Sequence, residues 1–342
     1  MRAIVLEKTG KPEVLKVKDV PTPDITNQDE LIVKLSYAGV NYADILSRKG
    51  QYSWAPKRPY VPGLEGYGII EKVGNNVKNY HPGDKVIVVA RNGTYAEYIK
   101  VTEEQIIPAV DFFSPEQNAA FAASYMTSMV GLYQMARVRP REKILVQAAA
   151  GALGIATVQL AKAMGLKVAG TASRPEKISF LKEKLEIDLA INYVEKDFRK
   201  EIMQWTNNRG VDVVLESVGG KVFKNSIDCL SPMGRIVVVG ATSINYSFLN
   251  PFSLIKAWRD IPRINVIKMI RNSYGVLGLH LGWLFTKDKE ELMPIKDQLL
   301  KIIKNNKIAP VIDTIFPLEK IAEAHRRIET RKNIGKIIIK IG

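Results

Sequence analysis

The sequence has 342 residues, which at ~150 residues per domain suggests about two domains. Apolar residues make up 46% and charged residues 25% of the chain, which excludes a disordered or fibrous protein. The one cysteine, Cys229, excludes a disulfide framework within the chain and a cysteine-rich zinc lobe. It also fits a reducing, cytoplasmic compartment.

Basic residues outnumber acidic ones by 50 to 35, which gives a formal net charge of +15. This charge is compatible with nucleic acid, with an anionic membrane or ligand, or with a general effect on solubility. The basic residues are mixed with acidic ones along the chain. Because no arginine-rich tail, zinc finger or aromatic ribonucleoprotein motif is present, we expect no nucleic acid partner.

The N-terminus lacks the apolar segment of a signal peptide. Two uncharged stretches, 117–136 and 144–161, have the length of a membrane span. Both are rich in Ala, Gly and polar side chains, so we expect them to be buried elements of a soluble protein.

Residues 1–110 contain short apolar or alternating runs separated by Gly, Pro, Asn and Asp, which predicts a compact β-barrel-like domain. The pattern changes near Ser114. Ser114 suits a helix N-cap, Pro115 the first helical position and Glu116 the first turn, which predicts a helix over 114–136.

From residue 143 onward, apolar strands alternate with helical patterns. The predicted strands cover 143–147, 167–172, 189–193, 211–217, 235–240 and 274–282. The clearest intervening helices cover 154–165 and 175–185. Such alternation predicts an α/β fold with a doubly wound parallel sheet.

The long segment 244–273 interrupts this order and is apolar, basic and aromatic. A predicted helix over 289–308 and a closing strand over 335–342 follow it. The β-rich start and the β-strand at the end can form one domain around an inserted α/β domain. We expect domains over 1–122 and 123–283, with residues 284–342 returning to the first.

The sharpest motif is the glycine loop AAAGALG, residues 148–154, between a predicted strand and a predicted helix. Ala150, Gly151 and Leu153 would let the backbone approach a pyrophosphate at the positive end of the helix. Gly154 would let the helix pack closely on the strand. This context predicts dinucleotide binding, although a purely structural turn of small residues is the alternative.

The end of the next strand distinguishes NAD from NADP. An NAD site usually has an acidic residue there, but this strand is followed by Ser173, Arg174 and, three residues later, Lys177. These side chains could hold a 2′-phosphate through charge-assisted hydrogen bonds, so we expect NADP (NADPH). The alternative is a solvated start of a helix.

Several motifs together resemble the zinc-free quinone oxidoreductase (zeta-crystallin-like) branch of the medium-chain dehydrogenases/reductases. They are AGVNYADILSRKGQY, PGLEGYGIIEKVG, GDKVIV, AAAGALG and INY. The runs RNGTYAEYI, ASYMTSMVGL and GVLGLHLGWL resemble the vesicle amine transport protein homologues. The resemblance covers nearly the whole chain. It implies a GroES-like β-barrel-type catalytic domain and a Rossmann cofactor domain.

The zinc ligands of this family are missing. Asn41 stands where the first zinc-binding cysteine would be, and Leu64 stands where the histidine of the His-Glu pair would be. Glu65 remains, but one carboxylate cannot hold a catalytic zinc ion. His81, His280 and His325 have no ligand spacing. We expect no metal, and therefore reduction of quinones or enones rather than oxidation of alcohols.

The resemblance also assigns site residues. On the substrate side it suggests Asn41 as an orienting group, Tyr52 as a hydrogen-bond or proton donor, and Asp44, which could instead brace its turn. On the cofactor side it suggests contacts with the cofactor for Thr127, Tyr193, Gly240, Ala241 and Arg331. Packing or solvent exposure is the alternative for Tyr52, Thr127, Tyr193 and Arg331. The proton donor stays open, and water is one possible source.

The sequence leaves two functions open. The first is an NADPH-dependent reductase of quinones or activated alkenes. The second is a nucleotide-binding protein that associates with lipid, motivated by the apolar and basic segment 250–269. A subunit contact or a lid is the favoured interpretation of that segment. We expect a homodimer that pairs through residues 274–281, although a tetramer is also compatible with the sequence. The physiological substrate stays unknown.

Overall fold

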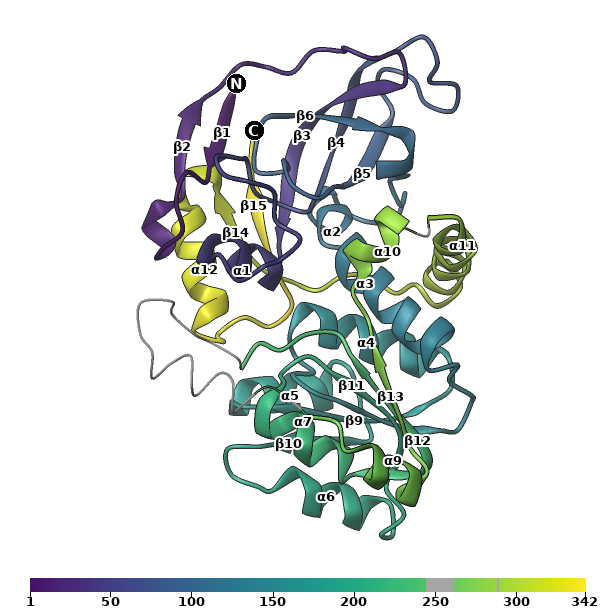
Figure 1. The fold of residues 1–342 in the computed structure, drawn as a ribbon. Coiled ribbons are helices and arrows are strands. Elements are labelled where there is room, and N and C mark those ends of the chain that lie inside the picture. The colour runs from purple at the N-terminus through teal and green to yellow at the C-terminus, as the bar shows by residue number, and fades with distance from the viewer. Residues whose placement is uncertain (244–260, 262, 288) are drawn as a thin grey trace. The chain divides into compact units, whose positions relative to one another are not determined.

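The C-terminal strand of the chain is built into a sheet that is otherwise mostly N-terminal. The computed structural model describes residues 1–243, 261, 263–287 and 289–342. The chain divides into a first unit, Met1–Ser124 with Ala309–Gly342, and a second unit, Tyr125–Ile308. In the first unit, β15 (Lys336–Lys340) lies between β14 (Ile312–Pro317) and β3 (Glu30–Val40) (Figure 1).

The sheet of the first unit has the order β14-β15-β3-β4-β5-β7, with β6 also paired to β3. The further strands of the unit are β1 (Arg2–Val5), β2 (Lys16–Asp19), β4 (Glu65–Val73), β5 (Lys85–Val89), β6 (Tyr98–Thr102) and β7 (Ile106–Pro108). Its helices are α1 (Tyr42–Lys49), α2 (Pro115–Ala119) and α12 (Ile321–Glu329), with short 3₁₀ turns at Pro12–Val14, Glu103–Gln105 and Leu318–Lys320. Residues from β3, β4, β5, β15 and α12 share one apolar core.

The second unit contains a six-stranded sheet in the order β10-β9-β8-β11-β12-β13. These strands are β8 (Lys143–Val146), β9 (Lys167–Ala172), β10 (Leu189–Asn192), β11 (Val211–Glu216), β12 (Leu230–Val238) and β13 (Gly275–Gly278). All neighbouring pairs are parallel, which confirms the predicted parallel sheet. The order reverses between β8 and β11, and α/β sheets bind ligands at the carboxyl ends of strands beside such a point.

Helices cover both faces of this parallel sheet. The helices of the unit are α3 (Ala122–Met129, which begins in the first unit), α4 (Ala152–Ala163), α5 (Pro175–Glu183), α6 (Phe198–Trp205), α7 (Gly220–Ile227), α9 (Val266–Asn272), α10 (Leu281–Lys287) and α11 (Lys289–Asn306), with a π-helical segment at Val130–Met135. Apolar residues of α6 and α7 pack with Leu145, Val214 and Ile236 of the sheet. In Figure 1, α4 lies above this sheet and α6 lies below it.

The predicted helix over 114–136 is present in pieces. The Ser114 hydroxyl accepts a hydrogen bond from Gln117 N at 3.2 Å, and Gln117 Oε1 accepts one from Ser114 N at 3.0 Å, so the expected N-cap is confirmed. The helix then stops at Ala119 and a new one begins at Ala122. The physical reason is that Ala123 N donates to the Glu65 carboxylate at 2.8 Å rather than to a preceding turn.

The structure shows where the C-terminal part returns to the first unit and how the two uncharged stretches fold. The return to the first unit occurs at Ala309, not at residue 284, because α11 packs against α4 and the π-helical segment of the second unit. Neither uncharged stretch forms a long helix, because 117–136 is broken and 144–161 contains a strand followed by a loop. Within the described residues, no helix combines the length and the apolar character needed to cross a membrane.

The segment that motivated the lipid hypothesis lies mostly outside the described residues. The structure does not describe residues 244–260 and 262, which include Phe252, Trp258 and Arg259. Of the predicted strand over 274–282, only Gly275–Gly278 is a strand, and α10 begins at Leu281. Among the strands that the structure describes, β13 is at the edge of its sheet.

Candidate active site

Strand pairing brings three polar side chains together in the first unit. Antiparallel pairing places Gly39 opposite Glu65, and Val40 opposite Ile337. The residue after Val40, Asn41, and the residue before Ile337, Lys336, therefore meet beside the start of β4. These three side chains, Asn41, Glu65 and Lys336, form what we call the Asn41 cluster.

The Asn41 cluster is a hydrogen-bonded network around a buried ion pair. Lys336 Nζ donates to Asn41 Oδ1 at 2.6 Å and to Glu65 Oε1 at 2.5 Å. Asn41 Nδ2 donates to Glu65 Oε1 at 3.0 Å. Glu65 is fully buried and Lys336 is 2% exposed, whereas Asn41 is half-buried. The ammonium neutralises the carboxylate, as a buried charge requires.

The donor set around Asn41 and Glu65 does not fit a zinc ion. An asparagine, a leucine and one carboxylate stand at the three positions, and the carboxylate is already bound to the Lys336 ammonium. Across the described ranges, no group of three or more His, Cys, Asp or Glu side chains could hold a metal ion. His81 and His280 are exposed, and His325 is buried.

Asp44 lies in the first turn of α1, next to the Asn41 cluster. Its carboxylate accepts hydrogen bonds from Asn41 N at 2.8 Å and from the Tyr95 hydroxyl at 2.9 Å. The side chain is 2% exposed, and burial raises its pKa to about 6 despite these hydrogen bonds. These contacts agree with the bracing role that we considered. A catalytic role for Asp44 stays a prediction.

Tyr52 is half-buried and meets the Trp54 ring edge-on, with ring centroids 6.4 Å apart. Burial, aided by the nearby Asp44 carboxylate, raises the pKa of its phenol to about 12. The phenol is therefore protonated at neutral pH and can donate a hydrogen bond, but it is a weak acid. Its predicted role as a donor to substrate stays a prediction.

In the second unit, the glycine loop connects β8 to α4. Ala148 has φ of 54°, and Gly151 is the N-cap of α4. A Cβ atom on Gly154 would lie 2.4 Å from the Ala148 carbonyl oxygen, so this close approach requires glycine. Ala150 is buried and Leu153 is half-buried. The first N–H groups of α4 have no intrahelical acceptor and can bind phosphate, so the loop fits a dinucleotide.

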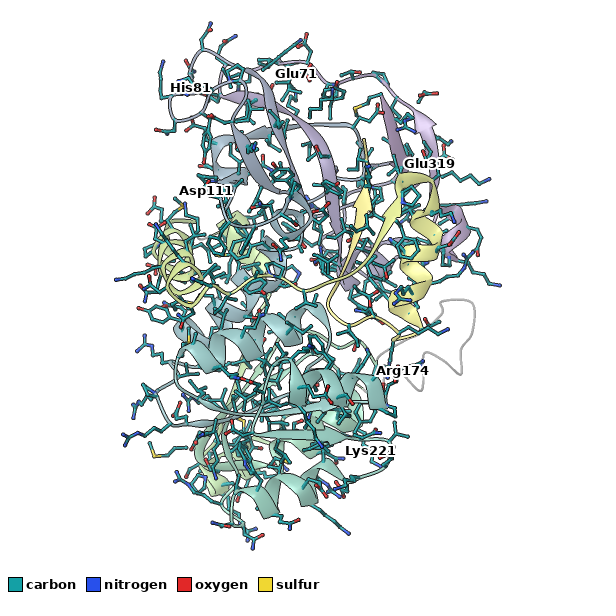
Figure 2. The ribbon with its side chains drawn as sticks, turned by 180° about the vertical axis from the view of Figure 1, so that it is seen from behind. Glu71, His81, Asp111, Arg174, Lys221 and Glu319 are labelled. Carbon is teal, nitrogen blue, oxygen red and sulfur yellow. The ribbon has the colours of Figure 1, made fainter. Side chains whose placement is uncertain are left out.

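The ends of β9 and β10 gather the residues predicted to recognise the 2′-phosphate. Tyr193 N donates to Ala172 O at 3.1 Å, which holds Tyr193 beside the segment that begins at Ser173. Arg174 is the N-cap of α5, and its half-exposed side chain lies at the surface of the unit (Figure 2). Lys177 is only 7% exposed, so its contribution to phosphate binding stays a prediction.

The loops after β11 and β12 contact each other through backbone hydrogen bonds. Ser243 N donates to Val218 O at 2.7 Å, and a Cβ atom on Gly240 would lie 3.3 Å from Ser217 O. The buried Glu216 carboxylate accepts hydrogen bonds from Val218 N at 2.7 Å and Gly219 N at 2.9 Å. This arrangement positions Gly240 and the exposed Ala241 at the carboxyl ends of the strands.

Thr127 and Arg331 are the remaining predicted contacts. Thr127 is half-buried on α3, and its neighbour Ser128 fixes this helix to α4 by a 2.8 Å hydrogen bond to Thr157. Arg331 is exposed in the first unit after α12, with φ of 54°. The roles of both residues toward a cofactor stay predictions.

Sequence reasoning missed Lys336, Tyr95 and Glu216. Tyr95 lies within the run RNGTYAEYI and Glu216 within the predicted strand 211–217, but neither run shows that these side chains hold turns through hydrogen bonds. Lys336 had a weak signal, because it is a charged residue directly before the apolar run III, residues 337–339. Only the pairing of β15 with β3 shows that this lysine faces Asn41 and Glu65.

Comparison with known proteins agrees with both units. Residues 27–111 match the family described as alcohol dehydrogenase GroES-like domain, and residues 152–274 match the family described as zinc-binding dehydrogenase. The second description names a metal for which the described side chains of this chain provide no ligand set.

Relatives match over nearly the full chain. The rat quinone oxidoreductase is 32% identical over 99% of this chain and 97% of its own length. The synaptic vesicle membrane protein VAT-1 homolog of Danio rerio is 31% identical over 99% of this chain and 69% of its own. The solved Escherichia coli quinone oxidoreductase, complexed with NADPH, has a TM-score of 0.87, 28% identity and complete coverage of both chains. The chain therefore belongs to the medium-chain dehydrogenase/reductase family, an oxidoreductase family that includes the quinone oxidoreductases.

Proposed function

We propose that this protein is an NADPH-dependent, zinc-independent reductase that transfers hydride to quinones or activated alkenes. The observation that carries the proposal is the contrast in charge between the two units. The second unit offers an anionic cofactor the N–H groups at the start of α4 and the half-exposed Arg174, whose guanidinium lies 3.9 Å from the exposed Glu176 carboxylate. In the first unit, Asn41 and Glu65, which the resemblance assigns to the ligand positions of the family's zinc enzymes, are hydrogen-bonded to the Lys336 ammonium.

NADPH is the proposed cofactor because of the residues that follow β9. When bound, NADPH supplies a hydride. The glycine loop would hold its pyrophosphate, and Ser173 and Arg174 would bind the 2′-phosphate that distinguishes it from NADH. The Escherichia coli quinone oxidoreductase of the same fold was solved with NADPH, which supports this choice.

The proposed substrate class follows from the chemistry available in the first unit. Reduction of an isolated carbonyl concentrates negative charge on one oxygen, which usually requires a strong electrophile. In a quinone or an enone the charge spreads over a conjugated system, so hydrogen-bond donors such as Tyr52 and Asn41 suffice. Hydride addition to carbon is completed by a proton from Tyr52 or water.

The direct test is NADPH oxidation with ortho-quinones, para-quinones, enals and enones, compared with NADH. In this assay, Arg174→Ala should raise the KM for NADPH by at least about tenfold and leave the KM for NADH nearly unchanged, because one charge-assisted phosphate contact is lost. Lys182→Ala is the matched control, since Lys182 is an exposed cation further along α5. Equal effects of Arg174→Ala on both cofactors would contradict the assignment of the 2′-phosphate site.

Lipid association is a second candidate, favoured by one observation. Three apolar side chains of α9, Val266, Ile267 and Ile270, are 61–73% exposed beside Lys268 and Arg271. Some relatives are named as synaptic vesicle membrane proteins. Sedimentation of the full chain with anionic vesicles at low salt tests this candidate. Wild-type protein that stays in the supernatant would exclude it.

Assembly and location are proposed with the same function. β13 pairs only with β12 among the described strands, so its outer edge can pair with a second copy of the chain. We expect a cytoplasmic homodimer. Light scattering after size exclusion would distinguish a monomer, a dimer and a tetramer.

A further inference from the structure

The amide of Asn41 has one chemically permitted orientation in the Asn41 cluster. An ammonium can only donate hydrogen bonds, and an ionised carboxylate can only accept them. Lys336 must therefore face Asn41 Oδ1, at 2.6 Å, and Glu65 must face Asn41 Nδ2, at 3.0 Å. A flipped amide would place two donors together and two acceptors together.

Packing fixes the position of Lys336 as well as its charge. A Cβ atom on Gly39 would lie 2.9 Å from Lys336 Cε and 3.0 Å from Glu65 Cγ, so both stems pass closely over this glycine. Glu65 Oε2 accepts the hydrogen bond from Ala123 N at 2.8 Å, which prevents the carboxylate from turning away. The ion pair is therefore a fixed support.

Only one member of the Asn41 cluster can meet a ligand. Glu65 is fully buried and Lys336 is 2% exposed, whereas Asn41 is half-buried. The second N–H of Asn41 is weakly engaged, at 3.4 Å from Gly39 O. The hydrogen-bonded route from Lys336 to a ligand is therefore the direction in which it holds the Asn41 amide, and its charge also acts on the nearby Asp44 carboxylate.

We propose that Lys336 is a positioning residue that, together with Glu65, presents the Asn41 amide to substrate in one fixed orientation. This inference rests on the reductase function proposed above. Lys336 does not contact the reacting atoms.

The test is the paired variant Glu65→Gln/Lys336→Met in the full chain. It removes both buried charges together, so no unpaired charge remains to unfold the protein. The introduced glutamine can still accept from Ala123 N, but its amide nitrogen then faces Asn41 Nδ2, and the introduced methionine donates nothing to Asn41 Oδ1. The Asn41 amide should invert. We expect kcat/KM for quinone reduction to fall by about 10- to 100-fold, mainly through kcat, because misplacement of a contact group has effects of this size.

A double-mutant cycle with Asn41→Ala shows whether the effect passes through Asn41. In the Asn41→Ala background, the paired variant should change kcat/KM by less than about twofold, because its target is gone. If the paired variant lowers kcat/KM by the same factor with and without Asn41→Ala, the result would contradict the proposal. So would wild-type kcat/KM in the paired variant alone. The control is Asp313→Asn/Arg327→Met, which removes another ion pair of the first unit and should leave kcat/KM within about twofold of wild type.

A readout without turnover separates this inference from the proposed function. Protein labelled with ¹⁵N-asparagine gives a side-chain amide resonance for Asn41, identified by its absence in Asn41→Ala. The resonance should shift in the paired variant and stay in place in the control. An unchanged resonance would overturn the role of Lys336. If the wild-type protein reduces no quinone or enone, the proposed function fails, and the resonance alone decides the role of Lys336.

Discussion

The two units differ in whether their charged and polar groups are already paired within the protein. In the first unit, the buried charges of Glu65 and Lys336 satisfy each other, and the buried Asp44 carboxyl is held by hydrogen bonds from Asn41 N and the Tyr95 hydroxyl. In the second unit, the start of α4 leaves backbone donors without intrahelical acceptors, and the half-exposed Arg174 has only a weak surface ion pair with Glu176, at 3.9 Å. A region with satisfied charges is suited to orienting a neutral substrate, whereas a region with unsatisfied donors is suited to binding an anionic cofactor.

The largest expected effect comes from breaking the satisfied pair. Lys336→Met leaves the fully buried Glu65 carboxylate without its counter-charge. We expect the free energy of unfolding, measured with urea, to fall by about 3–5 kcal/mol. Lys18→Met breaks the exposed pair with Glu7 and should leave stability nearly unchanged. Similar stabilities of the two variants would show that the buried pair is not the support that we describe.

A second test uses the buried His325. Its ring packs edge-on against Tyr95, neither ring nitrogen has a hydrogen-bond partner in the described part of the chain, and burial near Arg48 lowers its pKa to about 3. The unfolded chain therefore takes up a proton near pH 6.5, before the folded chain does, so stability is lost as the pH falls. We expect proton uptake by this residue in the unfolded chain to lower the free energy of unfolding by about 3 kcal/mol between pH 6.5 and 4. His325→Phe should lose less stability over this range, and a loss equal to that of wild type would contradict the assignment.

Asp44 should act in the opposite direction. Its carboxyl keeps a proton up to about pH 6 in the folded chain but releases it near its ordinary value in the unfolded chain. Asp44 therefore stabilises the folded chain in acid. As the pH rises from 4 to 6, this contribution to the free energy of unfolding falls by about 2–3 kcal/mol. In the His325→Phe background, where the opposing effect is removed, Asp44→Asn should flatten the urea-derived stability between pH 4 and 6. A slope that persists would assign the titration to another group.

The smallest expected change in stability distinguishes two glycines of the cofactor loop. A Cβ atom on Gly154 would lie 2.6 Å from Ala149 Cα, whereas one on Gly151 would lie 3.4 Å from its nearest neighbour, Ala148 O. Gly154→Ala should lower the free energy of unfolding by about 1–3 kcal/mol and weaken NADPH binding measured by calorimetry. Gly151→Ala should preserve the fold. Equal stability of the two variants would show that close packing at Gly154 is not required.

The second unit could be predicted in detail because its signals are local. The run 143–154 contains a strand, a glycine loop and the start of a helix, and each is visible in adjacent residues. Ser114 and Pro115 likewise marked the start of α2. The break after Ala119 was not predicted, because it depends on the Glu65 carboxylate, which binds Ala123 N from a distant strand.

The Asn41 cluster could be predicted only in part. The replacement of a cysteine by Asn41 was visible, but the partner of Glu65 was not. Lys336 is far from both in the chain and meets them only through the pairing of β15 with β3. Burial likewise could not be read from the sequence, so Arg174 and Lys177 looked equivalent although Lys177 is 7% exposed and the Arg174 side chain is 40% exposed.

The most direct test of the central claim is oxidation of NADPH by a para-quinone, followed by absorbance, after exhaustive treatment of the protein with a metal chelator. The account predicts that the treated protein oxidises NADPH at the rate of the untreated protein and uses NADH poorly. Loss of activity on chelation that returns with zinc, or equal use of NADH, would contradict it.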